Sequence, residues 1–549
     1  VTVVPVLLGY FIKGGVISSE KNPISRILKT IYKPIIQAVL RFPISTVFAA
    51  LIIMMVGLWP FTQLGSEFMP DLDEGDLMYM PTTLPAISIG KAQQILQQTD
   101  KLIRTVPEVD SVFGKIGRAD TATDPAPLTM IETLIRFKPR DEWREGMTVE
   151  KLKVEFNKLV KLPGITNAWV MPIKTRIDML ATGIKTPVGI KIAGTDLKVI
   201  ENIGRQIEKA LKNVPGTASV YAERVAGGRY LTVDIDRINA ARLGLNISDI
   251  QNIVRTAVGG MNVAETVEGL ERYPINIRYP HELRDSLEQI RLLPIVTPAG
   301  ARIPLGDVAL INVSDGPPMI KSENARINGW IFVDTKDRDL GSYVNEARER
   351  VAESVDLPSG YSISWSGQYE YMLRAMERLK IVVPITFIII FILLYLNFRK
   401  LSDVFLIMGF LPFALGGGAW FLYLSNYNLS VAVGVGFIAL AGIAVESGVV
   451  MLEFLNKSVD SFKSSEHEFN KEKLIANISE AASQRVRPIM MTTCSTIAGL
   501  LPIMFISGSG SEIMTRVAAP MIGGMLSATL LTLIVIPVVY FLWKKQSIK

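Results

Sequence analysis

The chain has 549 residues, of which 49% are hydrophobic and 20% are charged, and its formal net charge is +6. This composition is too apolar for an ordinary soluble protein and too charged for a bare membrane bundle, so it indicates a membrane part joined to a large soluble part. A single cysteine and two histidines exclude an internal disulfide framework and a Cys-based zinc site, whereas methionine occurs 21 times. Any metal chemistry must therefore use methionine or carboxylates.

The first 64 residues contain three candidate membrane segments. Residues 1–12 are apolar with no charged region before them, which indicates the tail of a transmembrane helix rather than a signal peptide. Residues 20–42 carry an apolar helical face with Arg26, Lys29 and Lys33 among it, and they predict an amphipathic helix on the cytoplasmic membrane surface. Residues 43–64 predict a full span. A chain that opens inside an apolar segment is interpreted as a fragment, or as half of something larger.

Five further transmembrane helices are predicted within residues 380–543, whereas residues 66–379 contain none. Every second loop of this region is basic, including the connection at Arg399 and Lys400 and the segment 456–488. Because Lys and Arg collect on the cytoplasmic side, residues 66–379 are predicted to lie outside the cytoplasm. The alternative is that these apolar runs form a globular core.

The soluble region repeats a unit made of a helix, a proline and a strand. Four such helices are predicted at 88–106, with Ser88 as its N-cap, and at 149–160, 197–211 and 344–355. Strand-like runs precede or follow them, for example at 131–137, 189–192, 329–334 and 363–365. This alternation predicts α+β subdomains of the split βαβ kind. One subdomain is expected at 66–187 and a second at 188–228 with 329–379, whereas 229–328 differs in texture and is interpreted as an insertion.

A carboxyl group, Glu446, lies near the middle of the apolar run 430–455, among small residues such as Gly442 and Gly448. A carboxyl at membrane depth is costly, usually faces a bundle interior and marks an ion or proton path. We therefore predict that Glu446 relays protons. The alternative is a neutral carboxyl kept for packing.

Three hydroxyl residues in the next predicted span, Thr492, Thr493 and Ser495, could pass protons to Glu446. Ordinary helix–helix hydrogen bonding explains them equally well.

Four long motifs resemble one protein family. They are MPTTLP at 80–85, GRADTATDPAPLTMIET at 117–133, RIDMLATGIK at 176–185 and AAPMIGGM at 518–525. The chain resembles the second half of a heavy-metal efflux pump of the resistance–nodulation–division (RND) superfamily, copper/silver branch, over nearly all its length. It departs from the family pattern at Ile489, where a lysine is common, and at Asn262, which stands opposite a family methionine with Met261 one place earlier.

The resemblance implies an assembly as well as a fold. A homotrimer in a Gram-negative inner membrane is expected, with residues 66–187 and 188–228 with 329–379 as periplasmic porter subdomains and 229–328 as a docking insertion. The expected partners are a periplasmic adaptor, an outer-membrane channel and membrane lipid, with no nucleic acid and no resident cofactor. The family also has an acidic residue on its fourth helix, which the sequence in hand does not include.

Soft monovalent ions such as Cu(I) and Ag(I) prefer thioether and thiolate ligands. Strand alternation in 128–137 places Met130 on one face with Glu132, opposite the apolar Ile131 and Ile135. A single methionine is more often a core gap-filler than a ligand. The resemblance, however, matches Met80, Met130 and Met179 to a three-methionine metal site.

Further residues are assigned by the resemblance alone. It places Asp124, Glu132, Arg176 and Lys185 around the metal site, although a structural ion-pair network explains these four as well. It also places Met514 on a methionine path through the membrane.

We expect a proton-driven transporter of Cu(I) and Ag(I), and not an enzyme. A pump for divalent zinc, cobalt or cadmium is the alternative within the family, and the scarcity of histidine argues against it. A drug or lipid exporter and a non-transporting scaffold are alternatives from other classes. No phosphate-binding glycine-rich loop is present, so ATP is not the evident energy source.

Overall fold

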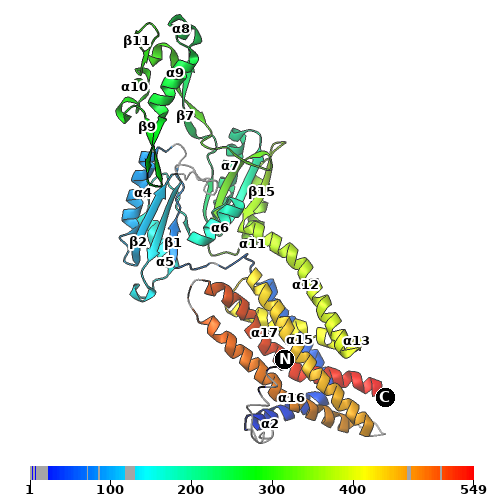
Figure 1. The fold of residues 1–549 in the computed structure, drawn as a ribbon. Coiled ribbons are helices and arrows are strands. Elements are labelled where there is room, and N and C mark those ends of the chain that lie inside the picture. Colours follow the sequence, from blue (N-terminus) through cyan, green and yellow to red (C-terminus); the bar gives the residue numbers. More distant parts are fainter. Residues whose placement is uncertain are drawn as a thin grey trace.

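The structure is a computed structural model that describes residues 3, 7, 23–70, 72–83, 87–117, 130–465, 471–506, 508 and 510–548. Figure 1 shows a bundle of long helices, two α/β units beside each other next to that bundle, and a smaller unit at the opposite end of the molecule. The predicted combination of a helical membrane bundle with a large α+β region is confirmed. The predicted segment 1–12 lies outside the described residues, except for Val3 and Leu7.

Among the described residues, six helical segments are long and apolar enough to cross a membrane, in line with the one span predicted at 43–64 and the five predicted in 380–543. They are Pro43–Thr62, Gln368–Phe398, Leu401–Leu424, Val431–Ser461, Lys471–Met504 and Ser511–Lys545. The helices that form them are α3 (Pro43–Leu58), α12 (Gln368–Phe398), α13 (Leu401–Met408), α14 (Leu411–Leu424), α15 (Val431–Ser465), α16 (Lys471–Leu500) and α17 (Ser511–Ile548). Helix α17 forms the centre of the bundle. In its most apolar part 61% of the residues are buried, compared with 6% in the most apolar part of α12.

Helix α2 (Pro23–Arg41) lies at the end of the bundle farthest from the α/β units (Figure 1). It buries Tyr32, Ile36 and Leu40 in a core shared with α16 and α17, and the Tyr32 hydroxyl donates a 2.6 Å hydrogen bond to the carbonyl of Leu533. The apolar face noted in the sequence, which includes Ile27 and Ile31, remains exposed. That face is therefore free to contact a membrane surface.

The first α/β unit has four antiparallel strands in the order β2-β3-β1-β4. They are β1 (Asp76–Tyr79), β2 (Val109–Ile116), β3 (Ile131–Phe137) and β4 (Trp169–Val170), and their helices are α4 (Ile89–Ile103) and α5 (Val149–Leu159). Ser88 caps α4 as predicted, because its side chain accepts from the N–H of Lys91 at 3.2 Å. Alternate strand residues such as Tyr79 and Ile135 share one core with residues of α4 and α5, for example Phe156 of α5.

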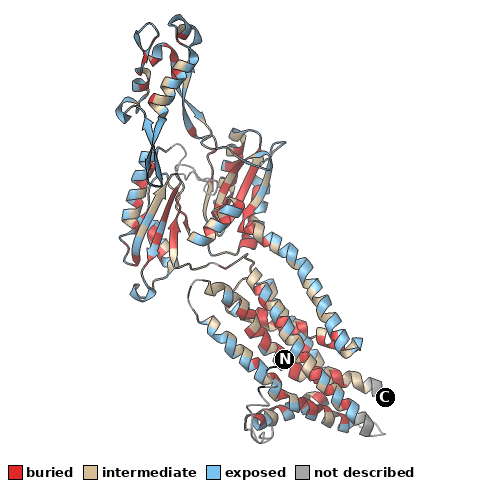
Figure 2. Ribbon diagram, viewed as in Figure 1, coloured by how far each residue is buried: buried red, intermediate tan, exposed pale blue. Residues whose placement is uncertain are grey.

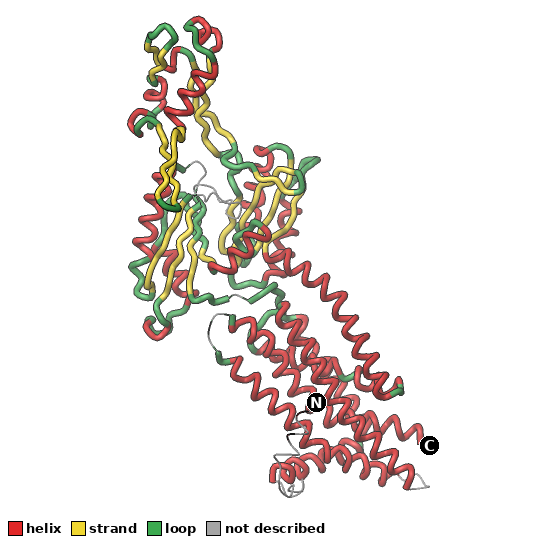
Figure 3. The backbone as a smooth tube through the Cα atoms, in the orientation of Figure 1, coloured by secondary structure: helices red, strands yellow, loops and turns green. Residues whose placement is uncertain are grey.

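The second α/β unit also has a largely antiparallel sheet, in the order β13-β14-β5-β15 with β6 beside β14. The strands are β5 (Val188–Gly194), β6 (Thr217–Ala222), β13 (Lys321–Glu323), β14 (Arg326–Thr335) and β15 (Ser362–Gly367), and the helices are α7 (Leu197–Leu211) and α11 (Leu340–Ser354). Both helices contribute to one apolar core with this sheet. Figure 3 shows α12 leaving this unit as one long helix that runs alongside the bundle.

Residues 236–308 form the unit farthest from the bundle, carried on a ribbon of β7 (Gly228–Ile235) paired with β12 (Ala309–Gly316). It contains α8 (Arg237–Arg242), α9 (Ile247–Val254), α10 (Leu287–Arg291), β10 (Pro294–Val296), β11 (Arg302–Pro304) and the hairpin of β8 (Met261–Glu268) with β9 (Glu271–Ile277). Figure 2 shows that β8 and β9 are exposed along their length, whereas β1, β3 and β5 of the α/β units are largely buried.

Candidate metal site and proton site

Helix α6 (Pro172–Thr182) was not foreseen, and it lies between the two sheets (Figure 1). Its buried positions are polar, namely Thr175, Asp178 and Thr182, whereas Ile177 and Leu180 are exposed. A helix that buries polar residues has no apolar stripe facing a core, so its sequence carries no amphipathic signal for a core-facing helix. The sequence features that could have predicted α6 are Pro172 at its first position and Gly183 at its end.

The end of α6 is fixed by Gly183, whose φ of 78° is in the left-handed region. A Cβ at Gly183 would lie 2.3 Å from the Trp330 ring, so the turn rests directly on β14 of the second unit. At the other end, the N–H groups of Ile173 and Lys174 donate to the carboxylate of Glu74 at 2.6 and 2.8 Å. Helix α6 is therefore held by both α/β units.

The sheet of the first unit presents Met80, Met130 and Glu132 on one face. Tyr79 pairs with Thr133, so the next residue, Met80, follows the register to lie beside Glu132. Strand alternation turns these side chains away from the core that contains Tyr79 and Ile135. Met80 is fully buried, whereas Met130 is half-buried. Met130 directly precedes β3 and, by strand alternation, lies on the same side as Glu132.

The third methionine belongs to α6, which meets the same face through Arg176. The Arg176 guanidinium lies 3.3 Å from Glu132 Oε2, and Met179 follows Arg176 three residues later, on the same side of the helix. The structure thus brings Met80, Met130 and Met179 to one region around Glu132.

Glu132 is buried, although the sequence pattern places it on the face of its strand opposite the apolar core residues. Lys115 Nζ on β2 lies 3.0 Å from Glu132 Oε2 and is paired with it across the sheet. Together with Arg176 it supplies two cations to one carboxylate, which compensates for the loss of hydration. Lys115 was missed because only the strand register, not the sequence, shows that it stands opposite Glu132.

Lys185 links the two α/β units at this site. Its ammonium donates to the carbonyl of Met80 at 3.3 Å and to the hydroxyl of Thr82 at 2.8 Å, and it lies 5.4 Å from the ring of Phe332 on β14. Burial lowers the pKa of Lys185 to about 8, because removing an ammonium from water disfavours its charged form. Asp124, the other residue expected here, lies outside the described residues.

A cleft of about 280 Å³ opens next to Met179, between the last turn of α6 and the edge of the second sheet. Its polar walls include Lys191, which is paired with Glu323 at 2.8 Å, and Lys321, whose ammonium lies 3.8 Å from the centre of the Trp330 ring. The half-buried Met179 therefore borders a space that a hydrated ion could enter.

No group of three or more His, Cys, Asp or Glu side chains that could hold a metal ion occurs among the described residues. Divalent zinc is usually bound by such groups. The three methionines offer neutral thioether sulfurs, which suit soft monovalent ions instead. The donor set of the described site thus favours a soft ion.

Glu446 does not face the interior of the described helices. It is exposed on α15, as is Gly442 one turn earlier, while Ala441 and Gly448 are buried. Helices α12–α17 therefore do not provide the expected burial of Glu446. Gly448, on another side of α15, packs against Ile407 and Ile536, whereas a Cβ at Gly442 would meet nothing within 4 Å.

The three hydroxyl residues of α16 separate into two groups. Thr493 is buried and shares a 2.8 Å hydrogen bond with Thr529 of α17, which is the structural alternative considered for it. Thr492 and Ser495 are exposed, although the Thr492 hydroxyl also donates to the carbonyl of Ile489 at 2.9 Å. Met514, near the start of α17, is exposed as well.

Among the described residues, six candidate membrane spans are joined to two α/β units, and a cleft opens beside Met179 where α6 meets the second sheet. This combination defines a class of membrane protein with a large region outside the bundle. The chain belongs to the AcrB/AcrD/AcrF family, because the model of that family matches residues 1–544.

Relatives place the chain among heavy-metal efflux proteins, as the motifs predicted. It is 50% identical over 542 residues to the cation efflux system protein CusA of Escherichia coli K12, covering 98% of this chain and 52% of that protein. It is 50% identical to the putative cation efflux system protein SilA of Salmonella typhimurium, covering 100% of this chain and 53% of that protein. The cobalt-zinc-cadmium resistance protein CzcA of Cupriavidus metallidurans is 34% identical, covering 100% of this chain and 51% of that protein.

The fold has a solved counterpart. A crystal structure of a heavy metal efflux pump superposes with a TM-score of 0.86 at 28% identity, covering 95% of this chain and 52% of that one. The chain thus spans about half the length of the relatives that it matches.

Proposed function

We propose that the chain is part of an RND pump that exports monovalent copper and silver in exchange for protons. The proposal is supported by the contact between α6 and the first sheet at Glu132, where Arg176 lies 3.3 Å from the carboxylate, because Met80, Met130 and Met179 belong to the segments that meet there. Three neutral sulfurs bind a soft cation without a change of protonation, and the nearby cations Lys115, Arg176 and Lys185 oppose tight binding. A transporter needs both properties, because its cargo must also leave.

Export of divalent zinc, cobalt or cadmium is the nearest alternative. It requires histidine or carboxylate ligands, and the described residues hold no cluster of them. Identity is also higher to CusA and SilA, at 50%, than to CzcA, at 34%. A drug or lipid exporter is disfavoured because the cleft beside Met179 is lined by the charged residues Lys191, Lys321 and Glu323 as well as by apolar ones, whereas sites for apolar ligands are lined mainly by apolar side chains.

The arrangement supports an orientation and a division into subdomains. The order β2-β3-β1-β4 with α4 and α5, and the order β6-β14-β5-β15 with α7 and α11, are the evidence for two porter subdomains of the split βαβ kind. We place them in the periplasm, with residues 229–328 as the docking insertion and the six spans in a Gram-negative inner membrane. Assembly as a homotrimer with a periplasmic adaptor and an outer-membrane channel completes the proposal.

Thiol labelling of intact cells tests the orientation. In a background where Cys494 is replaced by serine, a cysteine at Lys212 should react with an impermeant maleimide and a cysteine at position 463 should not. The opposite pattern would reverse the proposed topology.

Transport into inverted membrane vesicles tests the substrate. Vesicles that contain the complete pump and have an acidic interior should accumulate Ag(I), and Cu(I) under reducing conditions. Collapse of the proton gradient should stop this uptake. Zn(II) at the same concentration serves as the matched control. Uptake of Zn(II) but not Ag(I) would establish the divalent alternative.

A further inference from the structure

The connector of residues 65–68 joins the first span to the first α/β unit, and it is bonded on one side to the loop that precedes α15. The N–H of Leu429 donates to the carbonyl of Gly65 at 2.8 Å, and the N–H of Glu67 donates to the carbonyl of Leu429 at 2.9 Å. Ser66 and Leu429 form a parallel β-bridge. Helix α15, which carries Glu446, begins only two residues after Leu429, at Val431.

The other side of the connector is bonded to the start of α11 in the second unit. The N–H of Ser66 donates to Asp339 Oδ2 at 3.0 Å, and the N–H of Gly341 donates to the carbonyl of Ser66 at 3.1 Å. Asp339 is also the N-cap of α11, because the same carboxylate accepts from the N–H of Ser342 at 2.9 Å.

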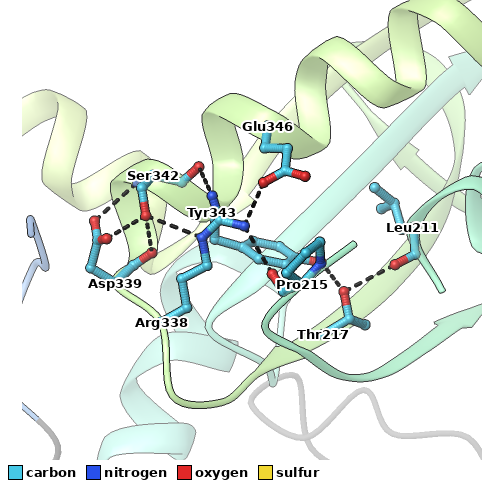
Figure 4. Close-up of polar contacts among 8 residues, drawn as sticks. All are labelled: Leu211, Pro215, Thr217, Arg338, Asp339, Ser342, Tyr343 and Glu346. Atoms are coloured by element: carbon cyan, nitrogen blue, oxygen red, sulfur yellow. Dashed lines mark hydrogen bonds and ion pairs between the residues drawn. The ribbon is translucent and has the colours of Figure 1, made fainter. Parts of the chain in front are cut away.

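The turn that carries Asp339 is itself held in the second unit. Figure 4 shows the Arg338 guanidinium reaching both the Glu346 carboxylate and the carbonyl of Pro215, at 2.6 and 2.9 Å. A displacement of Asp339 would therefore carry α11 and the turn after α7 with it.

Side chains reinforce the connector. Asn428 donates to Glu67 Oε2 at 2.9 Å, and Arg516 near the start of α17 lies 3.6 Å from Glu67 Oε1. Phe68 stacks on Tyr371 of α12, with ring centroids 5.2 Å apart, and packs against the core of the second unit. Residues 65–68 thus contact the starts of α11, α12 and α17 as well as the loop before α15.

We propose that residues 65–68 couple the position of α15 to the second α/β unit, and thereby to the cleft beside Met179. Glu446 lies 15 residues after the start of α15, about 22 Å along a rigid helix, so a shift of that helix moves its first turn and the loop before it. The backbone bonds from Leu429 to the connector and from the connector to α11 transmit this shift to the second sheet, which forms one wall of the cleft. The inference rests on the proposed function only where Ag(I) transport is used to test it.

A single methyl group can disturb this contact. A Cβ at Gly341 would lie 2.0 Å from Ser66 Oγ and 3.4 Å from Ser66 Cβ, so Gly341→Ala crowds Ser66 where its carbonyl is bonded to the start of α11. The double variant Ser66→Gly with Gly341→Ala removes that hydroxyl and the clash. Gly90→Ala is a matched control, because Gly90 is likewise the second residue of a helix and a Cβ there would meet nothing within 4 Å.

In the complete pump, Gly341→Ala should lower the Ag(I) transport rate roughly two- to thirtyfold, the range expected when coupling between sites is altered. The double variant should recover most of the rate, and Gly90→Ala should resemble the wild type. Binding of Ag(I) to purified Gly341→Ala protein should remain unchanged. A double variant as impaired as Gly341→Ala, or a Gly341→Ala variant that transports normally, would overturn the inference.

Hydrogen exchange tests the coupling without transport. Glu446→Gln should change the exchange of the amides of Ser66, Glu67 and Gly341, and this change should be absent when Gly341→Ala is added. If Glu446→Gln changes exchange in 427–431 but not at Ser66 or Gly341, the connector does not transmit the shift. This readout remains interpretable even if the pump proves to carry a different ion.

Discussion

The surroundings of Glu132 in the first α/β unit differ from those of Glu446 on α15. The buried Glu132 has Lys115 and Arg176 within 3.3 Å, and Lys185 bonds to the backbone of Met80. On α15, Glu446 is exposed with Gly442 one turn away. The described residues thus surround the carboxylate of Glu132, beside the proposed metal site, with cations, whereas the carboxylate of Glu446 is exposed on α15.

This difference shows which of the two sites the described residues can build. A sheet and its helices fix Met80, Met130 and Glu132 through their own register, so that site needs only the fold of the α/β units. A carboxyl group that faced hydrocarbon would be costly. We therefore expect the Glu446 face of α15 to be covered by further protein or to border water, and the predictions below test both sides of the comparison.

The largest effect is expected at the exposed carboxyl. Glu446→Gln in the complete pump should abolish metal transport while leaving Ag(I) affinity unchanged, because the amide cannot exchange a proton. Glu453→Gln is the control, since Glu453 lies two turns further along α15 and is paired with Lys457 at 2.7 Å. Full metal resistance in cells carrying Glu446→Gln would refute a proton-relay role.

The next effect concerns the sulfurs. Isoleucine at position 80, 130 or 179 keeps most of the apolar bulk and removes one ligand, so each substitution should weaken Ag(I) binding by roughly tenfold or more. The free energy of unfolding should change by less than about 1.5 kcal/mol, as for other near volume-conserving swaps. Isothermal titration and thermal melts measure the two quantities.

Met147→Ile provides the control, because Met147 packs against the core of the same α/β unit on the other side of its sheet. If all three site variants bind Ag(I) as the wild type does, the methionine site is wrong, and so is the choice of substrate.

A smaller effect is expected when the buried carboxylate loses its charge. Glu132→Gln removes the negative charge with which Lys115 and Arg176 are paired, and should lower stability by about 2 kcal/mol, the value typical of hydrogen bonds to charged groups. Because both cations are partly exposed, they can regain water and the loss stays moderate. Glu150→Gln, in an exposed pair with Lys153, should cost less than about 0.5 kcal/mol. Equal losses in denaturant titrations would show that burial of Glu132 contributes nothing.

The smallest effect is a pH dependence from Lys185. Its pKa is lowered to about 8 in the folded protein, so between pH 8 and about 10.4 the unfolded chain binds more protons than the folded one. The contribution of Lys185 to stability therefore rises with pH in this window, by about 1 kcal/mol after allowance for its partial exposure. In the Lys185→Met variant, the melting temperature should rise less steeply with pH across this window than it does in the wild type. An unchanged slope in that variant would assign the effect to other groups.

Periodicity predicted much of the scaffold. The bounds of α7 (Leu197–Leu211) and of β3 (Ile131–Phe137) agree with the predicted ranges, because apolar residues recur there at the period of a helix or a strand. The cap at Ser88 followed from its side chain alone. The placement of Met130 with Glu132, away from the core, followed from strand alternation.

Features that depend on neighbouring elements could not be predicted. Helix α6 was not predicted because its buried face is polar. The burial of Glu132 was not predicted because it depends on two cations from other segments. The exposure of Glu446 reflects which helices surround α15, and no pattern within α15 contains that information. The sequence thus predicts elements and faces, whereas contacts between distant segments come only from the fold.

The ribbon that carries the unit at residues 236–308 has a practical consequence for engineering. Ile235 and Ala309 are directly opposed in an antiparallel pair, so the chain leaves the second α/β unit and returns to it at one place. An Asn-Gly turn between these two residues would close β7 and β12 into an ordinary hairpin. The unit could therefore be excised, or exchanged for the equivalent segment of a relative, as a cassette whose removal leaves the sheets of both α/β units uncut.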